Sequence, residues 1–303
     1  MEVITARAIS MLALGIGSFL AGMLPTCFSE RTRQSHPLLI SCLLCFGGGV
    51  LLSTSLVHML PETREKLPEY SELMLCIGFF TVYLVDELSH LFLKTNGHSH
   101  GHERIGVGER SSLLTRERDD AELRDRHEGG SELCHVSHTE PCNRNASGVI
   151  GLLSALFVHS LLEGLAIGLQ DNATQILLLF AAVASHKFVV GFCLGAELCE
   201  SFPSSFCTRI SCVVLFSSGS VAGIALGAGL ETVQGMKDST AVPIMQGLAA
   251  GTLLYVTVSE VLPRERARWH ERDRKAGILQ FIAVGVGFGL MYLTTKYLDH
   301  DAD

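Results

Sequence analysis

Charged side chains are scarce over most of this 303-residue sequence. Asp, Glu, Lys and Arg make up 18% of the residues and apolar types 48%, and the apolar residues come in blocks instead of being spread evenly, as they would be in a soluble domain. The sequence also lacks the HExxH signature of zinc proteases and the GxSG and GxGD motifs of intramembrane proteases. We find no arrangement of nucleophile and base, so we do not expect an enzyme.

The apolar blocks have the length of transmembrane helices. A helix needs roughly 17 to 25 mostly apolar residues to cross a hydrocarbon core about 30 Å thick. Eight blocks qualify: 8–25, 37–61, 71–93, 148–169, 174–198, 208–230, 241–262 and 277–298. We therefore predict an all-α membrane protein with eight transmembrane helices. Residues 1–93 would form helices 1 to 3, residues 94–147 a loop, and residues 148–303 helices 4 to 8.

Basic residues are distributed unevenly between the segments that join these helices. Of the 23 Lys and Arg residues, 17 lie in segments 26–36, 94–147, 199–209 and 263–276, and five lie in the segments on the other side. Cytoplasmic loops of membrane proteins carry an excess of Lys and Arg. This bias predicts that loop 94–147 is cytosolic and that both termini are outside.

Two of the predicted helices share a sequence pattern. Helix two contains GGVLLSTSLVHMLPETRE from Gly48, and helix seven contains AGTLLYVTVSEVLPRERA from Ala250, aligned without a gap by an offset of 202 residues. The predicted topology sends these two helices across the membrane in opposite directions. We therefore predict that helices 1–3 and 6–8 form an inverted repeat around helices 4 and 5, a construction found in many transporters with a substrate site near the midplane.

Ionisable side chains interrupt helices four and five. His159 and Glu163 lie four residues apart and so share one face of helix four, and His186 lies in helix five. Such residues are costly at membrane depth and by default mark a pathway or a site. Imidazole and carboxylate are zinc ligands, which predicts a metal site; the alternative is a hydrogen-bonded pair that only holds helices together. Gly164 and Gly191 would let these two helices approach closely.

Further ionisable residues lie toward the ends of the predicted helices. His58 and Glu62 lie near the outer end of helix two, where they would attract an entering cation or simply face solvent. Glu260, aligned with His58 by the repeat, lies near the inner end of helix seven. His90 lies near the inner end of helix three, in a cluster that would form either an exit relay or a helix cap.

The loop 94–147 differs in composition from the rest of the chain. It is rich in charge and nearly free of aromatic residues, so we expect it to be largely disordered. His98, His100 and His102 alternate along it. Histidine-rich tracts bind metals, so the loop would bind metal in the cytosol or act as a solvated linker.

At these residues the sequence resembles the ZIP family of zinc and iron transporters, specifically its branch of plasma-membrane zinc importers. The resemblance covers nearly the whole chain and is carried by VHSLLEGLAIGLQ in helix four, SHKFVVGF in helix five, and LPE and LPRE at the ends of helices two and seven. It implies a multi-pass plasma-membrane protein that carries Zn²⁺ from outside, or from an organelle lumen, into the cytosol by alternating access. His159, Glu163 and His186 would then be metal ligands. A receptor or sensor that binds metal without turnover is the alternative.

The sequence departs from the family pattern beside these ligands. Many members have asparagine next to the helix-four histidine and carboxylates one and four positions after the helix-five ligand; here the residues are Ser160, Lys187 and Val190. The loss of these oxygen ligands predicts one bound metal ion instead of two. Lys187 would supply the charge of the second ion, with Glu163 as counter-charge, or would extend toward water.

The expected partners follow from the same resemblance. Zinc is expected as the transported substrate, so no cofactor is expected, and no nucleic acid. The same ligands would accept Fe²⁺, Mn²⁺ or Cd²⁺, and the natural order of affinities does not choose among them. Beyond the lipid bilayer, a homodimer is a candidate assembly.

Overall fold

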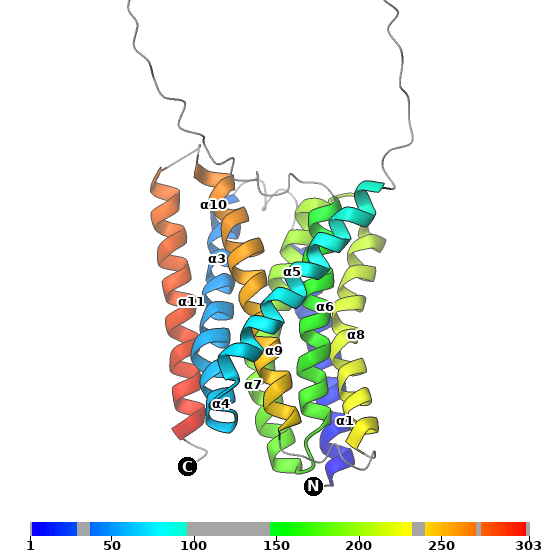
Figure 1. The fold of residues 1–303 in the computed structure, drawn as a ribbon. Helices are drawn as coiled ribbons and strands as arrows, with labels where there is room; N and C mark the ends of the chain where they lie inside the picture. Colours follow the sequence, from blue (N-terminus) through cyan, green and yellow to red (C-terminus); the bar gives the residue numbers. More distant parts are fainter. Residues whose placement is uncertain (1, 29–36, 96–145, 232–239, 271–273, 301–303) are drawn as a thin grey trace, which may run out of the picture.

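The computed structural model describes residues 2–28, 37–95, 146–231, 240–270 and 274–300, and these residues form an all-helical bundle (Figure 1). Eight long helical units run through it. They are α1 (Val3–Met23), followed by the short turn η1 (Leu24–Cys27); α3, η2 and α4 (Pro37–Ser53, Thr54–Met59 and Leu60–Lys66); α5 (Ser71–Thr95); α6 (Ala146–Gly168); α7 (Ala173–Ser201); α8 (Phe206–Glu231); α9, η3 and α10 (Ala241–Tyr255, Val256–Val261 and Leu262–His270); and α11 (Arg274–His300).

Each predicted span falls on one of these units. Seven of them are long and apolar enough to cross a membrane. The eighth, α5, has 25 residues and so is about 37 Å long. Several helices extend beyond the apolar blocks, as α10 does through its charged turns, because an apolar block marks the lipid-facing length and not the end of helical hydrogen bonding. The prediction of an all-α membrane protein is confirmed.

The chain crosses the bundle an even number of times. The start of α1 and the end of α11 lie at one end, and the end of α5 and the start of α6 lie at the other (Figure 1). The predicted cytosolic loop 94–147 joins α5 to α6 at that second end. Apart from its margins it lies outside the described residues, and so do His98, His100 and His102.

Glycines set the closest helix contacts. A Cβ atom at Gly164 would clash with the carbonyl oxygen of Ser220 in α8, and a Cβ atom at Gly191 would lie 3.1 Å from the carbonyl oxygen of Ser18 in α1. The prediction that these glycines bring helices four and five together is therefore wrong. They pack α6 against α8 and α7 against α1, which leaves the other faces of α6 and α7 turned toward each other at the ionisable residues.

Two helical units contain a wider turn just before a proline. In η2 the backbone N–H of Leu60 donates to the carbonyl of Ser55, and in η3 the N–H of Leu262 donates to Thr257, five residues back in each case. Proline follows directly, and it has no N–H and cannot continue the α-helical ladder, so the chain adopts π-helical turns here. The two turns are separated by the same 202-residue offset as the sequence match.

Candidate metal centre

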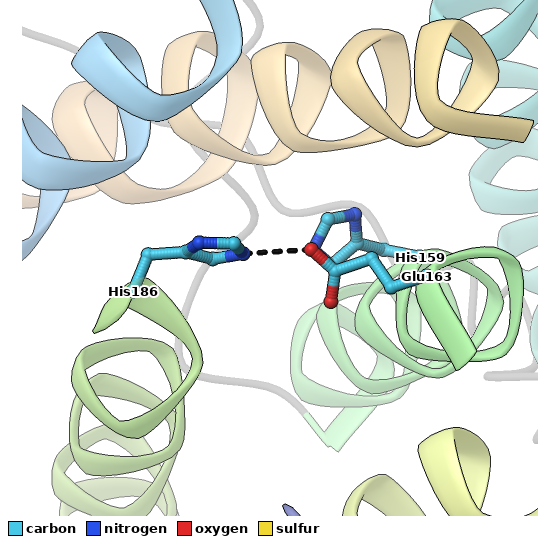
Figure 2. A group of neighbouring side chains, drawn as sticks. All are labelled: His159, Glu163 and His186. Carbon is cyan, nitrogen blue, oxygen red and sulfur yellow. Dashed lines mark hydrogen bonds and ion pairs between the residues drawn. The ribbon is translucent and has the colours of Figure 1, made fainter. Parts of the chain in front are cut away.

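Three ionisable side chains meet in the middle of the bundle. His159 and Glu163 extend from α6 and His186 from α7, and one ligand atom from each lies within 4.8 Å of the others (Figure 2). Their relative exposures are 1%, 2% and 1%, so all three are fully buried. The i, i+4 spacing on α6 and the contact with α7 bring together the three residues named by the sequence.

Both imidazole rings point toward the same carboxylate oxygen. Nε2 of His186 lies 2.7 Å from Oε1 of Glu163, and Nε2 of His159 lies 3.1 Å from that oxygen without making a hydrogen bond. The other ring nitrogens are tied to backbone: Nδ1 of His186 lies 3.2 Å from the carbonyl of Ala182, and Nδ1 of His159 lies 3.1 Å from that of Ala249. A carbonyl oxygen only accepts, so each Nδ1 carries the proton and donates it.

This tautomer determines what the centre can hold. With the proton on Nδ1, a neutral His159 presents a lone pair at Nε2 toward the carboxylate. Nε2 of His186 makes a hydrogen bond to the same carboxylate oxygen, which only accepts, so without a metal ion that bond needs a proton on Nε2 of His186 as well. Three electron-pair donors this close repel one another unless a proton or a metal ion lies between them. Two imidazole nitrogens and a carboxylate oxygen match a common zinc ligand set, with a fourth position left for water.

The helix unit α9 supplies an outer support for the centre. Oγ1 of Thr252 lies 3.0 Å from Nδ1 of His159 and donates to the carbonyl of Ala249 at 2.7 Å, so it accepts from the imidazole. Such partners fix the orientation and basicity of a ligand histidine. Sequence reasoning missed Thr252, because a threonine inside an apolar helix carries no signal of its own.

Lys187 lies beside the same carboxylate. Its Nζ donates to Oγ of Ser160 at 2.8 Å, lies 3.6 Å from Oε2 of Glu163, and stands 4.9 Å from the centre of the Phe216 ring. The side chain is 1% exposed, so the alternative in which it extends toward water is wrong. The predicted counter-charge is present. Val190, at the other altered position, is buried in an apolar cluster and offers no ligand atom.

A pocket continues from the centre toward the end where the termini lie. It is lined by Glu163 and His186 of the centre and by His58 and Glu62, which are half-buried. Oε1 of Glu62 also pairs with Nζ of Lys66 at 3.0 Å on the surface. The structure thus brings the two residues proposed for the outer end into one pocket with the centre.

On the opposite side of the centre lies a second cavity. It is lined mainly by leucines and valines and ends at Glu197 and Glu260, where ion pairs join the helices. Arg264 donates to Glu197 at 2.9 Å and to Glu260 at 2.6 Å, and Arg268 pairs with Glu197 at 3.2 Å. Sequence reasoning found Glu260 but missed its i, i+4 partner Arg264, and it missed Glu197 because the pairs of Glu197 depend on how α7 packs against α10.

The cluster predicted near His90 is only partly described. Asp86 is buried and accepts a hydrogen bond from the Tyr255 hydroxyl at 3.0 Å, which links α5 to α9. The two predicted roles of this cluster, an exit relay or a helix cap, stay predictions. The side chain of His90 lies outside the described residues.

Comparisons with known proteins agree with this architecture. A family model described as "ZIP Zinc transporter" matches residues 4–295. The chain is similar to human "Zinc transporter ZIP3", with 29% identity over 96% of this chain and 99% of that protein. It is also similar to human "Zinc transporter ZIP1", with 28% identity over 93% of this chain and 88% of that protein, and to human "Zinc transporter ZIP2", with 27% identity over 93% and 94%.

Proposed function

This chain belongs to the ZIP family of zinc transporters, and from that premise we propose how it moves its metal ion. It is a multi-pass zinc transmembrane transporter, as the family match and the similar zinc transporters indicate. The metal ion is transported substrate and not a resident cofactor. It binds at His159, Glu163 and His186, is accepted from the outer side and is released to the cytosol.

One observation carries this proposal. The Nε2 atoms of two buried histidines converge on one carboxylate oxygen while both Nδ1 atoms donate to acceptors. A merely structural pair would need one histidine and one carboxylate. A second histidine aimed at the same oxygen adds nothing to such a pair, but it completes a ligand set for a divalent ion.

The centre holds one metal ion. The ammonium of Lys187 lies 3.6 Å from Oε2 of Glu163, on the side of the carboxylate away from the histidines, where a second cation would otherwise bind. Ser160 is engaged as the acceptor of Lys187, and Val190 has no donor atom. The fixed positive charge limits how tightly a divalent ion is held, which favours release.

Transport follows alternating access. The pocket next to the centre reaches His58 and Glu62, whereas the other side is closed by apolar side chains and by the Arg264 and Arg268 ion pairs. Opening toward the cytosol would separate α10 from α7 and break the pairs that Glu197 forms with Arg264 and Arg268. Glu197, once released, would then attract the departing cation.

The halves that move are related as an inverted repeat. The repeat would pair α1 with α8, α3 with α9, α5 with α11 and α6 with α7. Under this pairing the contact between α3 and α11 corresponds to the one between α9 and α5, and the contact between α1 and α7 corresponds to the one between α8 and α6. All four contacts are present. Gly49 meets the backbone of α11, and Gly251, 202 residues later, meets the backbone of α5. The two π-helical turns, with the same offset, support the same proposal.

The orientation and setting follow the charge distribution. We place both termini outside and loop 94–147 in the cytosol, at the plasma membrane. Fe²⁺, Mn²⁺ and Cd²⁺ fit the same ligands and would compete with Zn²⁺. A homodimer remains a proposed assembly. Nothing in the described residues favours a receptor without turnover.

Uptake of radiolabelled Zn²⁺ into cells tests the proposal. Glu163→Gln and His159→Ala should abolish uptake while the protein still reaches the surface. Glu69→Gln, which changes an exposed carboxylate away from the centre, is the matched control and should transport normally. Uptake at the control rate by either centre variant would refute the assignment of the site.

A further inference from the structure

Gln246 is a buried polar residue whose position has no structural explanation. It lies on α9 and is 3% exposed, and its Oε1 atom is buried without a hydrogen-bond partner among the described residues. A buried amide oxygen that loses water without gaining a partner is costly, and such groups are uncommon in folded proteins. A ligand that arrives during function would account for it.

Gln246 lines the pocket that adjoins the metal centre. The same pocket is lined by His58 and Glu62 toward the end with the termini and by Glu163 and His186 at the centre. α9 packs against both η2 and α4, the segments that carry His58 and Glu62. An amide oxygen, an imidazole and a carboxylate from three adjacent segments therefore line one space.

We propose that Gln246, His58 and Glu62 form an outer binding site in which a partly hydrated divalent metal ion pauses before it passes to Glu163 and the two histidines. This inference rests on the proposed function of the centre. The amide oxygen is a neutral ligand, and the half-exposed pair of Glu62 with Lys66 already neutralises part of the charge of that carboxylate, so the site binds weakly. Weak binding at successive sites lets an ion both enter and leave.

A purely structural role for Gln246 predicts different effects of substitution on stability and on zinc uptake. If the amide were only an unsatisfied group in the bundle, replacing it with a similarly sized apolar residue would stabilise the protein or leave it unchanged and would not affect zinc uptake. A ligand role requires a change in the concentration dependence of uptake, and it requires leucine and glutamate at this position to act in opposite directions.

Zinc uptake kinetics at equal surface expression separate these roles. Gln246→Leu should raise KM for Zn²⁺ about fivefold, the loss of one neutral polar contact, with Vmax within about a factor of two. Gln246→Glu should lower both KM and Vmax, because a carboxylate binds the ion more tightly and releases it more slowly. Thr295→Val, which replaces another buried and unpartnered polar group outside both cavities, is the control and should leave KM unchanged.

Direct binding to purified full-length protein keeps this inference separate from the function of the centre. In a Glu163→Gln, His186→Ala background, equilibrium dialysis with Zn²⁺ should detect residual binding that weakens when Gln246→Leu is added. If Gln246→Leu fails to reach the surface, Gln246→Met takes its place. A wild-type KM in the leucine or methionine variant, or residual binding unchanged by it, would overturn the outer site, whereas normal uptake by Glu163→Gln would overturn the centre.

Discussion

Thr252→Val tests whether the hydroxyl of Thr252, on α9, helps to position His159 in the transport centre. The hydroxyl of Thr252 accepts from Nδ1 of His159 at 3.0 Å and donates to the carbonyl of Ala249 at 2.7 Å. Valine keeps the β-branched shape and removes the hydroxyl, so the backbone of α9 should be unchanged. His159 would keep one acceptor, the Ala249 carbonyl at 3.1 Å, but would lose the contact that restrains rotation of the ring.

The size of the effect follows from that remaining acceptor. Loss of an outer-shell partner of a ligand histidine reduces metal affinity about 10- to 100-fold. Because the Ala249 carbonyl remains, we expect the lower end: KM for Zn²⁺ should rise about tenfold, equivalent to about 1.4 kcal/mol. Thr252→Ser keeps the hydroxyl and should restore most of the affinity.

The assay is uptake of labelled Zn²⁺ over a concentration series, normalised to protein at the surface. Thr257→Val is the matched control, because among the described residues Oγ1 of Thr257 bonds to the carbonyl of Leu253 in the same helix unit, at 2.8 Å, and to no residue of the centre. It should leave KM unchanged. An unaltered KM in Thr252→Val, or an equal rise in Thr257→Val, would show that the Thr252 hydroxyl does not position the ligand.

Two more substitutions test the charges around the pathway. Lys187→Met should reduce the Vmax of zinc uptake far more than it reduces surface expression. It should also lower the melting temperature of the metal-free protein, because removing one member of a buried pair costs about 3–5 kcal/mol. Normal uptake by this variant would contradict the role of the ammonium. Glu197→Gln removes a carboxylate that accepts hydrogen bonds from Arg264 and Arg268. Cys193 is 7% exposed and lines the cavity that ends at Glu197. Thiol reagents added from the cytosol should therefore label Cys193 roughly tenfold faster in this variant. Glu200→Gln, which removes only an outer partner of Arg268, is the control, and equal labelling in both would contradict the closure.

The helices and the three central residues were predictable from local sequence. Apolar blocks long enough to cross a bilayer are a strong signal, and His159, Glu163 and His186 are conspicuous because few ionisable residues occur at that depth. The i, i+4 spacing fixed the relation of the first two without knowledge of the fold.

The supporting residues were not predictable in this way. Thr252 and Gln246 are ordinary residues in an apolar helix. They acquire a role only because α9 packs against α6, about 90 residues earlier in the sequence, and against α4, about 180 residues earlier. Gly164 shows the same limit: its spacing indicated a close contact but not with which helix, and the partner is α8. Arg264 was counted only as a topology marker, although it bonds Glu197 in α7.

The most direct test of the central claim is zinc K-edge X-ray absorption on the purified protein loaded with one equivalent of Zn²⁺. The account predicts one zinc ion bound by two imidazole nitrogens and a carboxylate oxygen at about 2.0–2.2 Å, with no sulfur ligand. The imidazole signal should fall when His159 and His186 are both replaced with alanine. A spectrum that is unchanged in that double variant, or one dominated by cysteine sulfur, would contradict the account.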